Sequence, residues 1–494
     1  MTDLFKHIET LRIDGGVAGD VTGVSYDSRR VLPGHVFVAV PGQRTDGNSF
    51  VEAALDRGAV AVVETVDRKP FRRETHVTVA NARRALAGLS AAYHGFPDQS
   101  LKMIGITGTN GKTTTAFMVK HLLESCGIRS GLLGTVRYEV GDRVIPAART
   151  TPEAPEIHEM LATMKQAGCG ACVMEVSSHA LAQDRVHGLD FDVAAFTNLT
   201  QDHLDYHKSM EDYFAAKALL FQSLGRKEKT AVAVLNTDDD SGLVLMEKIP
   251  MQARKVSYGI DTPASLRARI LSLEGRGCRF VLVQAGQEQE VTLPMTGRHN
   301  VSNALCALGI GLSLGLDTAG MIAALATLRG VPGRLEAVAH RLPFDVFVDY
   351  AHTDDALRNV LRTVREFARG RVILVFGCGG SRDAKKRPLM GRVASELADF
   401  SVLTSDNPRK ENPADILRQI SAGFGGAEKH AVIEDRREAI FRALSMAREN
   451  DIVLVAGKGH ETYQEFADAI VPFDDREVVA ECLTQIAESR PWKQ

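Results

Sequence analysis

The chain has 494 residues, of which 44% are hydrophobic and 24% are charged, and its formal net charge is −3 at pH 7. These values are ordinary for globular proteins, and the length predicts several domains. The small negative charge gives no indication of a nucleic-acid-binding surface, and no apolar run approaches the length of a membrane span. The first residues include acidic side chains and lack the apolar core of a signal peptide, so a cytoplasmic location is expected.

Seven scattered cysteines favour a reducing compartment over a disulfide scaffold. Cys169 and Cys172 form a CxxC pair, which could indicate zinc. No second pair or nearby histidine completes such a site, and Cys172 opens an apolar run. Buried structural thiols are therefore the favoured interpretation.

Residues 1–98 form the first predicted domain, a small α/β unit. Apolar runs at 36–40 and 58–64 predict strands, and the polar stretch Asp27-Ser28-Arg29 precedes the first of them. Judged by residue type alone, that stretch is a polar turn rather than a binding site. The turn-rich segment 93–100 is the predicted linker to the next domain.

The segment 101–115, LKMIGITGTNGKTTT, is the clearest functional motif. An apolar strand runs into a glycine-rich turn and then into a helical pattern, which is the setting of a phosphate-binding P-loop. In such a loop, Lys112 would reach the outer phosphates and Thr113 would bind Mg²⁺, while backbone N–H groups attract phosphate oxygens. Ile106 stands where the general pattern has glycine, and an ordinary glycine-rich turn is the disfavoured alternative. The candidate phosphate-binding residues are Gly108, Thr109, Asn110, Gly111, Lys112, Thr113 and Thr114.

Residues 99–331 alternate short apolar runs with helical patterns, which predicts a mainly parallel sheet covered by helices. The expected strands are 103–106, 171–176, 193–196 and 231–235. Glu175 stands at a strand's carboxyl end, where such sheets bind ligands, and it suits a metal near the P-loop. His203 and His207 are predicted to share a helix face, one of them as a metal ligand or orienting group. A zinc site is disfavoured because HExxH is absent, and a helix-capping cluster is the alternative.

Lys217 lies within EDYFAAKALLF, an otherwise apolar helical pattern at 211–221. A lysine in such a helix usually extends its amine to solvent. If the side chain is buried instead, the pKa of its amine falls and the amine can react. The sequence leaves both alternatives open.

Residues 332–494 repeat the strand–helix alternation after a predicted hinge at 330–336, which is rich in glycine and proline. Polar residues follow each expected strand. Gly377-Cys378-Gly379 begins like a dinucleotide-binding fingerprint, but Arg382 stands where the third glycine is required. The fingerprint therefore fails. The expected strands are 345–348, 371–376, 400–403 and 451–455.

Eight motifs, in one order along nearly the whole chain, resemble those of the Mur ligases of peptidoglycan synthesis. They are TGTNGKTTT, EVSSHAL, TNLTQDHLDYH, the lysine of YFAAKALLF, GRHNVSNALCAL, VPGRLE, DYAHT and SDNPRKENP. The resemblance implies three α/β domains. Residues 1–98 would bind UDP and the muramoyl substrate, residues 99–331 would be a P-loop ATPase-type ligase domain, and residues 332–494 would be a Rossmann-like domain that binds the amino acid.

The resemblance is greatest to the ligases that add diaminopimelate, and it implies their cytoplasmic reaction. ATP would phosphorylate the glutamyl carboxylate of UDP-N-acetylmuramoyl-L-alanyl-D-glutamate. The amine of meso-2,6-diaminopimelate would then attack the acyl phosphate through a tetrahedral intermediate. ATP and Mg²⁺ are the implied cofactors, and a monomer without nucleic-acid or membrane partners is expected. Because phosphorylation supplies the leaving group, catalysis would be mostly positioning and charge neutralisation.

The resemblance also implies roles for individual residues, among them carbamylation of Lys217 to give an anion. The implied catalytic residues are Lys112, Glu175, His203 and Lys217. The implied metal-binding residues are Thr113, Glu175, His203 and Lys217. Contacts to adenosine are implied for Asn303, Arg334 and Asp349. Contacts to the UDP-muramoyl-peptide are implied for Ser28, Thr150, Thr151, Ser177, Gln183 and Arg185. Contacts to the amino acid are implied for Arg382, Asp406, Asn407, Arg409, Gly457 and Glu461.

The chemistry of diaminopimelate supports the last of these sets. This amino acid is lysine with an extra carboxylate at its far end. Arg382 and Arg409 offer planar guanidinium groups for that carboxylate, and Asp406 and Glu461 suit the ammonium group. Lysine would leave the arginines without a counter-charge, and a polar site commonly rejects an analogue that lacks its partner by about 10⁴-fold.

Two positions depart from the family pattern. Asp354 replaces a usual proline, which predicts a less rigid loop, and Arg149 replaces a common asparagine, which places one substrate contact in question. The alternatives are a lysine-adding or D-alanyl-D-alanine-adding Mur ligase, a folylpolyglutamate synthetase and a nucleotide switch. Folylpolyglutamate synthetases typically continue GTNGK with Gly-Ser, whereas this chain has Thr113-Thr114. A GTPase switch requires NKxD, and this chain has no Asn-Lys pair.

Overall fold

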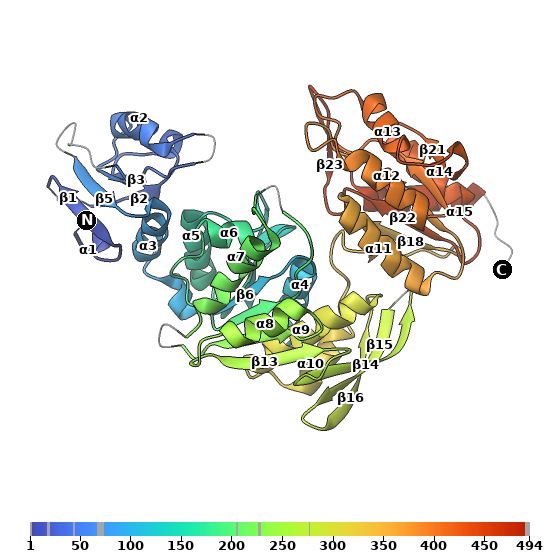
Figure 1. Cartoon of the computed structure of the whole chain (residues 1–494), viewed down its shortest axis with the longest axis horizontal. Helices are drawn as coiled ribbons and strands as arrows, with labels where there is room; N and C mark the ends of the chain where they lie inside the picture. Colours follow the sequence, from blue (N-terminus) through green and yellow to red (C-terminus); the bar gives the residue numbers. More distant parts are fainter. Residues whose placement is uncertain are drawn as a thin grey trace. The chain divides into compact units, whose positions relative to one another are not determined.

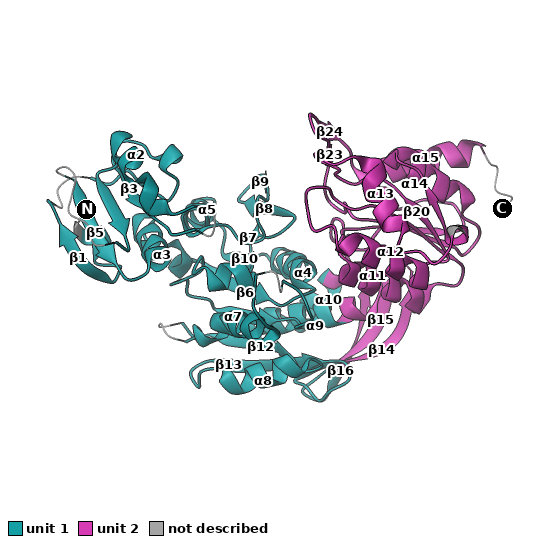
Figure 2. Cartoon of the chain, turned by 45° about the horizontal axis from the view of Figure 1, so that its top comes forward, with its two compact units in different colours: residues 1–267, 283–287, 302–324 teal, residues 268–282, 288–301, 325–494 magenta. Residues whose placement is uncertain are grey.

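The computed structural model describes residues 2–16, 20–42, 45–66, 74–203, 206–225, 229–275 and 277–489 (Figure 1). The chain divides into two compact units (Figure 2). The first comprises Met1–Arg267, Val283–Gln287 and Ser302–Ala324, and the second comprises Ala268–Leu282, Glu288–Val301 and Leu325–Gln494. Both units consist of helices and mostly parallel strands, which is the predicted α/β class.

The first unit begins with a small sheet and its covering helices. Its elements are α1 (Thr2–Phe5), β1 (Thr10–Asp14), β2 (Gly23–Ser25), η1 (Ser28–Arg30), β3 (His35–Val38), η2 (Gly47–Phe50), α2 (Val51–Asp56), β4 (Ala61–Glu64), β5 (Thr75–Val79) and α3 (Ala82–Tyr93). The strand order is β1-β5-β4-β3-β2, with β1 antiparallel to β5 and the other strands parallel. Alternate residues of β3, among them Val36 and Val38, pack with Leu86 and Leu89 of α3 in one core.

The large sheet of the first unit carries the P-loop. Its elements are η3 (Pro97–Ser100), β6 (Lys102–Thr107), α4 (Lys112–Ser125), β7 (Ser130–Leu133), β8 (Arg137–Val140), β9 (Arg143–Pro146), α5 (Ala154–Gln166), β10 (Ala171–Glu175), α6 (Ser178–Ala182), β11 (Val193–Phe196), α7 (Met210–Gln222), β12 (Val232–Asn236), α8 (Asp240–Lys248), β13 (Arg254–Gly259), α9 (Arg298–Ser313) and α10 (Thr318–Leu325). The order β13-β12-β11-β6-β10-β7 is parallel, and β8 and β9 continue it as an antiparallel hairpin. The central strands are apolar except at their end residues, because helices cover both of their faces.

Some features of this region were not predicted. The hairpin of β8 and β9 is one, and the strands β14 (Leu266–Glu274), β15 (Gly277–Gln284) and β16 (Gln287–Leu293) are others. The segment expected as a linker is closely packed: Asp98 is 1% exposed, and its carboxylate accepts the backbone N–H of Asp190 at 3.1 Å. Within the described ranges, no helix combines the length and the apolar character of a membrane span.

The second unit contains a doubly wound sheet. Its elements are β17 (Glu336–Ala337), β18 (Asp345–Asp349), α11 (Asp354–Phe367), β19 (Val372–Phe376), α12 (Lys386–Leu397), β20 (Phe400–Leu403), α13 (Pro413–Ser421), η4 (Ala427–Lys429), β21 (His430–Val432), α14 (Arg436–Met446), β22 (Ile452–Ala456), β23 (Tyr463–Glu465), β24 (Ile470–Pro472) and α15 (Asp475–Ser489). The order is β17-β18-β22-β19-β20-β21, in which β17 is antiparallel and the others are parallel. Leu374 of β19 packs in the core with α11, α12 and α13, whereas Ile373 packs with α14 and α15.

Asp354 occupies the first position of α11. The Thr353 hydroxyl caps this helix by accepting the backbone N–H of Ala356 at 3.2 Å. An aspartate in the first turn interacts favourably with the positive end of the helix dipole. The departure from proline therefore has a local structural reason.

Candidate active site

The P-loop connects β6 to α4. Gly108 and Gly111 have φ values of +147° and +84°, which L-residues rarely adopt. A Cβ on Gly108 would collide with Oγ1 of Thr197, and one on Gly111 would collide with Oδ1 of Asn303. The turn leads into the first residues of α4, whose outward N–H groups and dipole attract anions.

Two lysines meet at the carbonyl of Gly108. Nζ of Lys112 donates to the carbonyls of Gly108 at 2.9 Å and Thr109 at 2.8 Å, and Nζ of Lys217 donates to the Gly108 carbonyl at 2.8 Å. Lys217 is 2% exposed, and its Nζ lies 4.2 Å from the ring centroid of Tyr213. Burial, followed by the charge of Lys112, holds the pKa of Lys217 well below its usual value. Of the two alternatives, the structure therefore has the buried lysine.

Glu175 lies at the end of β10 and is fully buried. Its Oε2 accepts the hydroxyl of Thr113 at 2.9 Å and that of Thr135 at 3.0 Å, and its Oε1 accepts the backbone N–H of Thr135 at 2.9 Å. Carboxylate and hydroxyl oxygens are ligands that Mg²⁺ prefers, with phosphate oxygens completing its shell in nucleotide sites. The donor set of Thr113 and Glu175 therefore fits Mg²⁺.

The prediction that His203 and His207 share a helix face is wrong. His203 has a left-handed backbone with φ of +54°, and α7 begins only at Met210. The left-handed residue interrupts helical geometry at this point. The ring of His203 packs edge-to-face on that of Tyr213 with centroids 6.0 Å apart, while Nε2 of the buried His207 lies 2.9 Å from Oγ of Ser178. Both histidines neighbour the Tyr213 ring, which also contacts Lys217.

 The edge-to-face packing on Tyr213 is particular to His203, because the ring of His207 lies tilted on Tyr213 with centroids 5.1 Å apart.

Five of the predicted substrate-binding residues gather at the end of β10. They are Thr150, Thr151, Ser177, Gln183 and Arg185. Oγ1 of Thr151 donates to the carbonyl of Glu175 at 2.8 Å and accepts the backbone N–H of Ser177 at 3.0 Å. Arg185 donates to the Thr151 carbonyl at 2.9 Å and to Oε1 of Gln183 at 2.6 Å, and Oγ1 of Thr150 lies 3.0 Å from that of Thr135.

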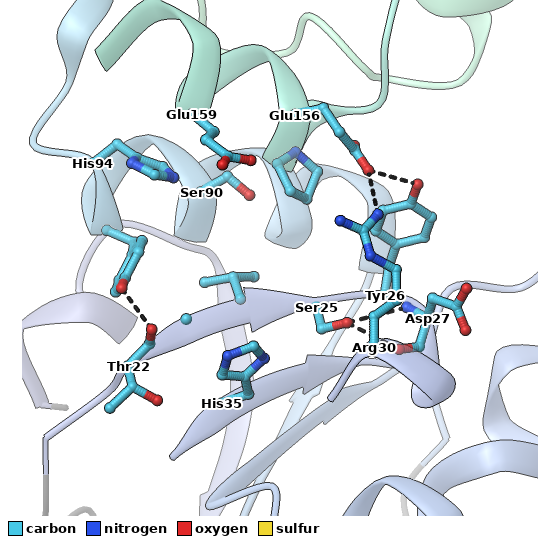
Figure 3. A pocket seen from close by; sticks show the side chains of 14 residues that line it. Thr22, Ser25, Tyr26, Asp27, Arg30, His35, Ser90, His94, Glu156 and Glu159 are labelled. Carbon is cyan, nitrogen blue, oxygen red and sulfur yellow. Dashed lines mark hydrogen bonds and ion pairs between the residues drawn. The ribbon is translucent and has the colours of Figure 1, made fainter. Parts of the chain in front are cut away.

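Ser28 opens η1, next to a pocket of about 300 Å³ (Figure 3). The pocket is lined by residues of β2, β3, α3 and α5. The carboxylate of Glu156 accepts the hydroxyl of Tyr26 at 3.1 Å and Nη1 of Arg30 at 3.2 Å, and Glu159 contributes a second carboxylate. The pocket therefore combines these carboxylates with the guanidinium of Arg30 and the imidazoles of His35 and His94.

The three residues predicted to contact adenosine belong to different units. Asn303 lies in the first unit, where its Oδ1 accepts the hydroxyl of Thr115 at 3.4 Å. Arg334 and Asp349 lie in the second unit. The carboxylate of Asp349 accepts two backbone N–H groups at 2.6 and 2.8 Å, and burial raises its pKa while the charge of Arg334 opposes the rise. The guanidinium of Arg334 lies 5.3 Å from the ring centroid of Tyr350.

Four of the predicted amino-acid-binding residues lie together after β20 and β22. They are Asp406, Asn407, Gly457 and Glu461. Nδ2 of Asn407 donates to Oε2 of Glu461 at 2.9 Å. Gly457 has φ of +116°, and a Cβ there would lie 3.0 Å from Oδ2 of Asp406. Asp406 and Asn407 are buried, and Glu461 is partly exposed.

The two predicted arginines differ in their surroundings. Nε of Arg409 donates to Oε2 of Glu465 at 2.7 Å, and its Nη1 donates to the carbonyl of Gly380 at 3.0 Å. Arg382 is exposed. The expectation that Arg409 has no counter-charge without diaminopimelate is therefore wrong, because Glu465 on β23 supplies one.

Several residues of the site were missed by sequence reasoning. They are Thr135, Asn198, Tyr213, Lys458 and Glu465. The carbonyl and Oδ1 of Asn198 accept the N–H groups of Thr109 and Asn110 at 2.8 and 2.9 Å. Asn198 belongs to a polar cluster after a predicted strand, so its place in the sequence could have indicated a role in the site. Thr135 and Glu465 carry no such signal, because neither belongs to a recognised motif.

Comparison with known families accounts for all three parts of the chain. The model of the Mur ligase family catalytic domain matches residues 20–94, that of the Mur ligase middle domain matches residues 106–311, and that of the Mur ligase glutamate ligase domain matches residues 333–459. The chain belongs to the Mur ligase family.

Individual Mur ligases resemble this one over nearly its whole length. UDP-N-acetylmuramoyl-L-alanyl-D-glutamate–2,6-diaminopimelate ligase of Clostridium tetani (strain Massachusetts / E88) is 42% identical over 98% of this chain and 99% of its own. The ligase of the same name from Solibacter usitatus (strain Ellin6076) is 46% identical over 94% of each chain. A solved structure of a ligase with this name has a TM-score of 0.70 at 33% identity and covers 95% of this chain and 96% of its own.

Proposed function

We propose that this Mur ligase joins meso-2,6-diaminopimelate to UDP-N-acetylmuramoyl-L-alanyl-D-glutamate in a reaction driven by ATP. It would act in the cytoplasm, as a monomer, in peptidoglycan precursor synthesis. The observation that carries the proposal is the cluster of Asp406, Asn407 and Glu461 beside Arg409, whose groups complement an amino acid with an ammonium and an extra carboxylate. The near full-length similarity to ligases named for this reaction supports it.

The first step is transfer of a phosphoryl group to the glutamyl carboxylate. A carboxylate oxygen attacks the γ-phosphorus of ATP, and the bond from that phosphorus to the bridging oxygen breaks. ADP is released, and the glutamyl carboxylate has become an acyl phosphate. Lys112 and the N-terminus of α4 would neutralise phosphate charge. Thr113 and Glu175 would hold Mg²⁺, which would supply positive charge at the phosphates. The residues around Thr151 and Arg185 would hold the muramoyl-peptide, and Ser28 would contact its UDP part.

Lys217 is suited to carbamylation. A neutral amine is needed to attack CO₂, and burial with a lowered pKa favours that neutral form. Formation of the N–C bond with loss of one proton converts the neutral amine into an anion beside Lys112, so the ammonium form loses two protons in all. The anion attracts the charge of Lys112 and supplies oxygen atoms that could bind metal or orient the acyl phosphate, with His203 nearby across Tyr213.

In the second step the amine of diaminopimelate attacks the acyl carbon. The tetrahedral intermediate expels phosphate, and the amine loses a proton to give the amide. Asp406 and Glu461 would attract an ammonium group of the amino acid, and Arg409 would bind its far carboxylate with the guanidinium edge that Glu465 leaves accessible. Arg382, Gly457 and Asn407 would complete this site.

Phosphate release tests the proposal. Release that requires ATP, the UDP-dipeptide and diaminopimelate together is the expected result. Hydrolysis of ATP at the same rate without either of the other substrates would refute it and would favour a nucleotide switch.

A further inference from the structure

Lys458 lies in the loop directly after β22, and its side chain is 0% exposed. Its Nζ donates to Oδ1 of Asn407 at 3.2 Å and to Oε2 of Glu461 at 3.2 Å, and it lies 3.7 Å from Oδ1 of Asp406. Nζ also lies 5.5 Å from the ring centroid of Tyr463. Its three polar partners are therefore all candidate readers of the amino acid.

These contacts fix the orientation of the Asn407 carboxamide. Its Oδ1 accepts both from Lys458 and from the backbone N–H of Glu465 at 2.9 Å, while its Nδ2 donates to Glu461 at 2.9 Å. An ammonium and a backbone N–H can only donate. The reversed amide would therefore place its NH₂ group against two donors, and Lys458 selects the orientation in which Asn407 holds Glu461.

The charges of this cluster do not cancel. Asp406 and Glu461 each carry −1 and Lys458 carries +1, which leaves a net charge of −1 for the three groups. Arg436, which is also buried, pairs with Asp475 at 2.7 Å, and the charges of Asp406 and Glu461 act on it more weakly. Among themselves, Asp406, Glu461 and Lys458 thus carry one excess negative charge, which suits the ammonium group of an amino acid. Removal of Lys458 would leave two carboxylates of the cluster without their shared cation, which is strongly unfavourable for buried groups.

We propose that Lys458 is a positioning residue for the amino-acid substrate, acting through Asn407 and Glu461. The inference rests on the proposed function. Lys458 does not touch the substrate, because its side chain is completely enclosed. It aligns Glu461 and limits the local charge to the single negative charge that one ammonium group neutralises.

The variant Lys458→Met tests this role, since it keeps the length of the side chain and removes its charge. We expect the KM for diaminopimelate to rise about tenfold or more, while those for ATP and the UDP-dipeptide stay within about twofold. Lys458→Gln, which retains an N–H donor, should raise the KM for diaminopimelate less than Lys458→Met does. Lys429→Met, at an exposed lysine of the same unit, is the matched control and should change none of the three.

Trapping of the acyl phosphate separates positioning from loss of structure. Hydroxylamine attacks the acyl carbon, phosphate leaves, and a hydroxamate forms without diaminopimelate. Hydroxamate formation should be preserved in both Lys458 variants. Unchanged KM values, or hydroxamate formation that falls in parallel with ligation in both variants, would overturn the proposal. A wild-type chain that forms no hydroxamate from ATP and the UDP-dipeptide would instead overturn the proposed function, and this inference with it.

Discussion

Gly108 gives a sharp test of how the P-loop is held. Its φ of +147° is open to glycine, and a Cβ there would collide with Oγ1 of Thr197 and lie 3.1 Å from backbone atoms of Asn198. The hydroxyl of Thr197 donates to the carbonyl of Asn110 at 2.6 Å. Gly108→Ala therefore requires the loop to move, or Thr197 to rotate and give up this hydrogen bond.

The expected effect of Gly108→Ala is the sum of the backbone strain and the lost hydrogen bond. The strained backbone costs about 1–3 kcal/mol and the lost hydrogen bond about 1 kcal/mol, which together correspond to roughly 30-fold or more in an equilibrium constant. Gly127→Ala is the matched control, because Gly127 also has a positive φ (+80°) but has no other atom within 4 Å of the added Cβ. It should carry only the conformational penalty, about 1–2 kcal/mol.

Thermal unfolding and the KM for ATP measure both variants. Gly108→Ala should lower the unfolding temperature more than Gly127→Ala does, and it should raise the KM for ATP, which Gly127→Ala should leave unchanged. Equal unfolding temperatures with an unaltered KM for ATP in both variants would refute this account of the loop.

The other predictions concern Lys217, Arg409 and Glu465. Lys217→Ala should nearly abolish ligation, with partial recovery when short carboxylic acids are added; full activity without them would exclude the carbamate. The folded chain lowers the pKa of Lys217, so between the folded and unfolded pKa values the unfolded chain binds one more proton than the folded chain. The free energy of unfolding in CO₂-free buffer should therefore rise with pH up to about 10.5. Denaturation curves of Lys217→Met should show a smaller rise. Arg409→Ala should raise the KM for diaminopimelate far more than that for ATP, and equal increases would contradict the specificity assignment. Glu465→Gln keeps an acceptor for Nε of Arg409 and removes the counter-charge, so the preference for diaminopimelate over lysine should increase by about two- to fivefold, measured as a ratio of kcat/KM. An unchanged ratio would show that Glu465 does not tune this choice.

The buried parallel strands could be predicted from the sequence because their signal is local. The predicted strand 193–196 coincides with β11, and the predicted strand 103–106 falls within β6. Short, wholly apolar runs that alternate with helical patterns are typical of parallel strands buried on both faces. Lys112 and Thr113 were identifiable for a similar reason, since a P-loop is a contiguous motif.

Contacts between distant segments could not be predicted in this way. Glu465 meets Arg409 from 56 residues away, through a hairpin that no motif marked. The error at His203 has a different cause, because the i, i+4 spacing suggested a helix and the left-handed backbone at this residue prevents one. The sequence also left the state of Lys217 open, since burial depends on how α7 packs beneath the P-loop.

The most direct test of the central claim is ADP formation with a panel of amino acids, in the presence of ATP and UDP-N-acetylmuramoyl-L-alanyl-D-glutamate. We predict rapid formation with meso-2,6-diaminopimelate, much slower formation with lysine or D-alanyl-D-alanine, and none when the UDP-dipeptide is omitted. ADP formed at one rate with every amino acid, or without the UDP-dipeptide, would contradict the assignment.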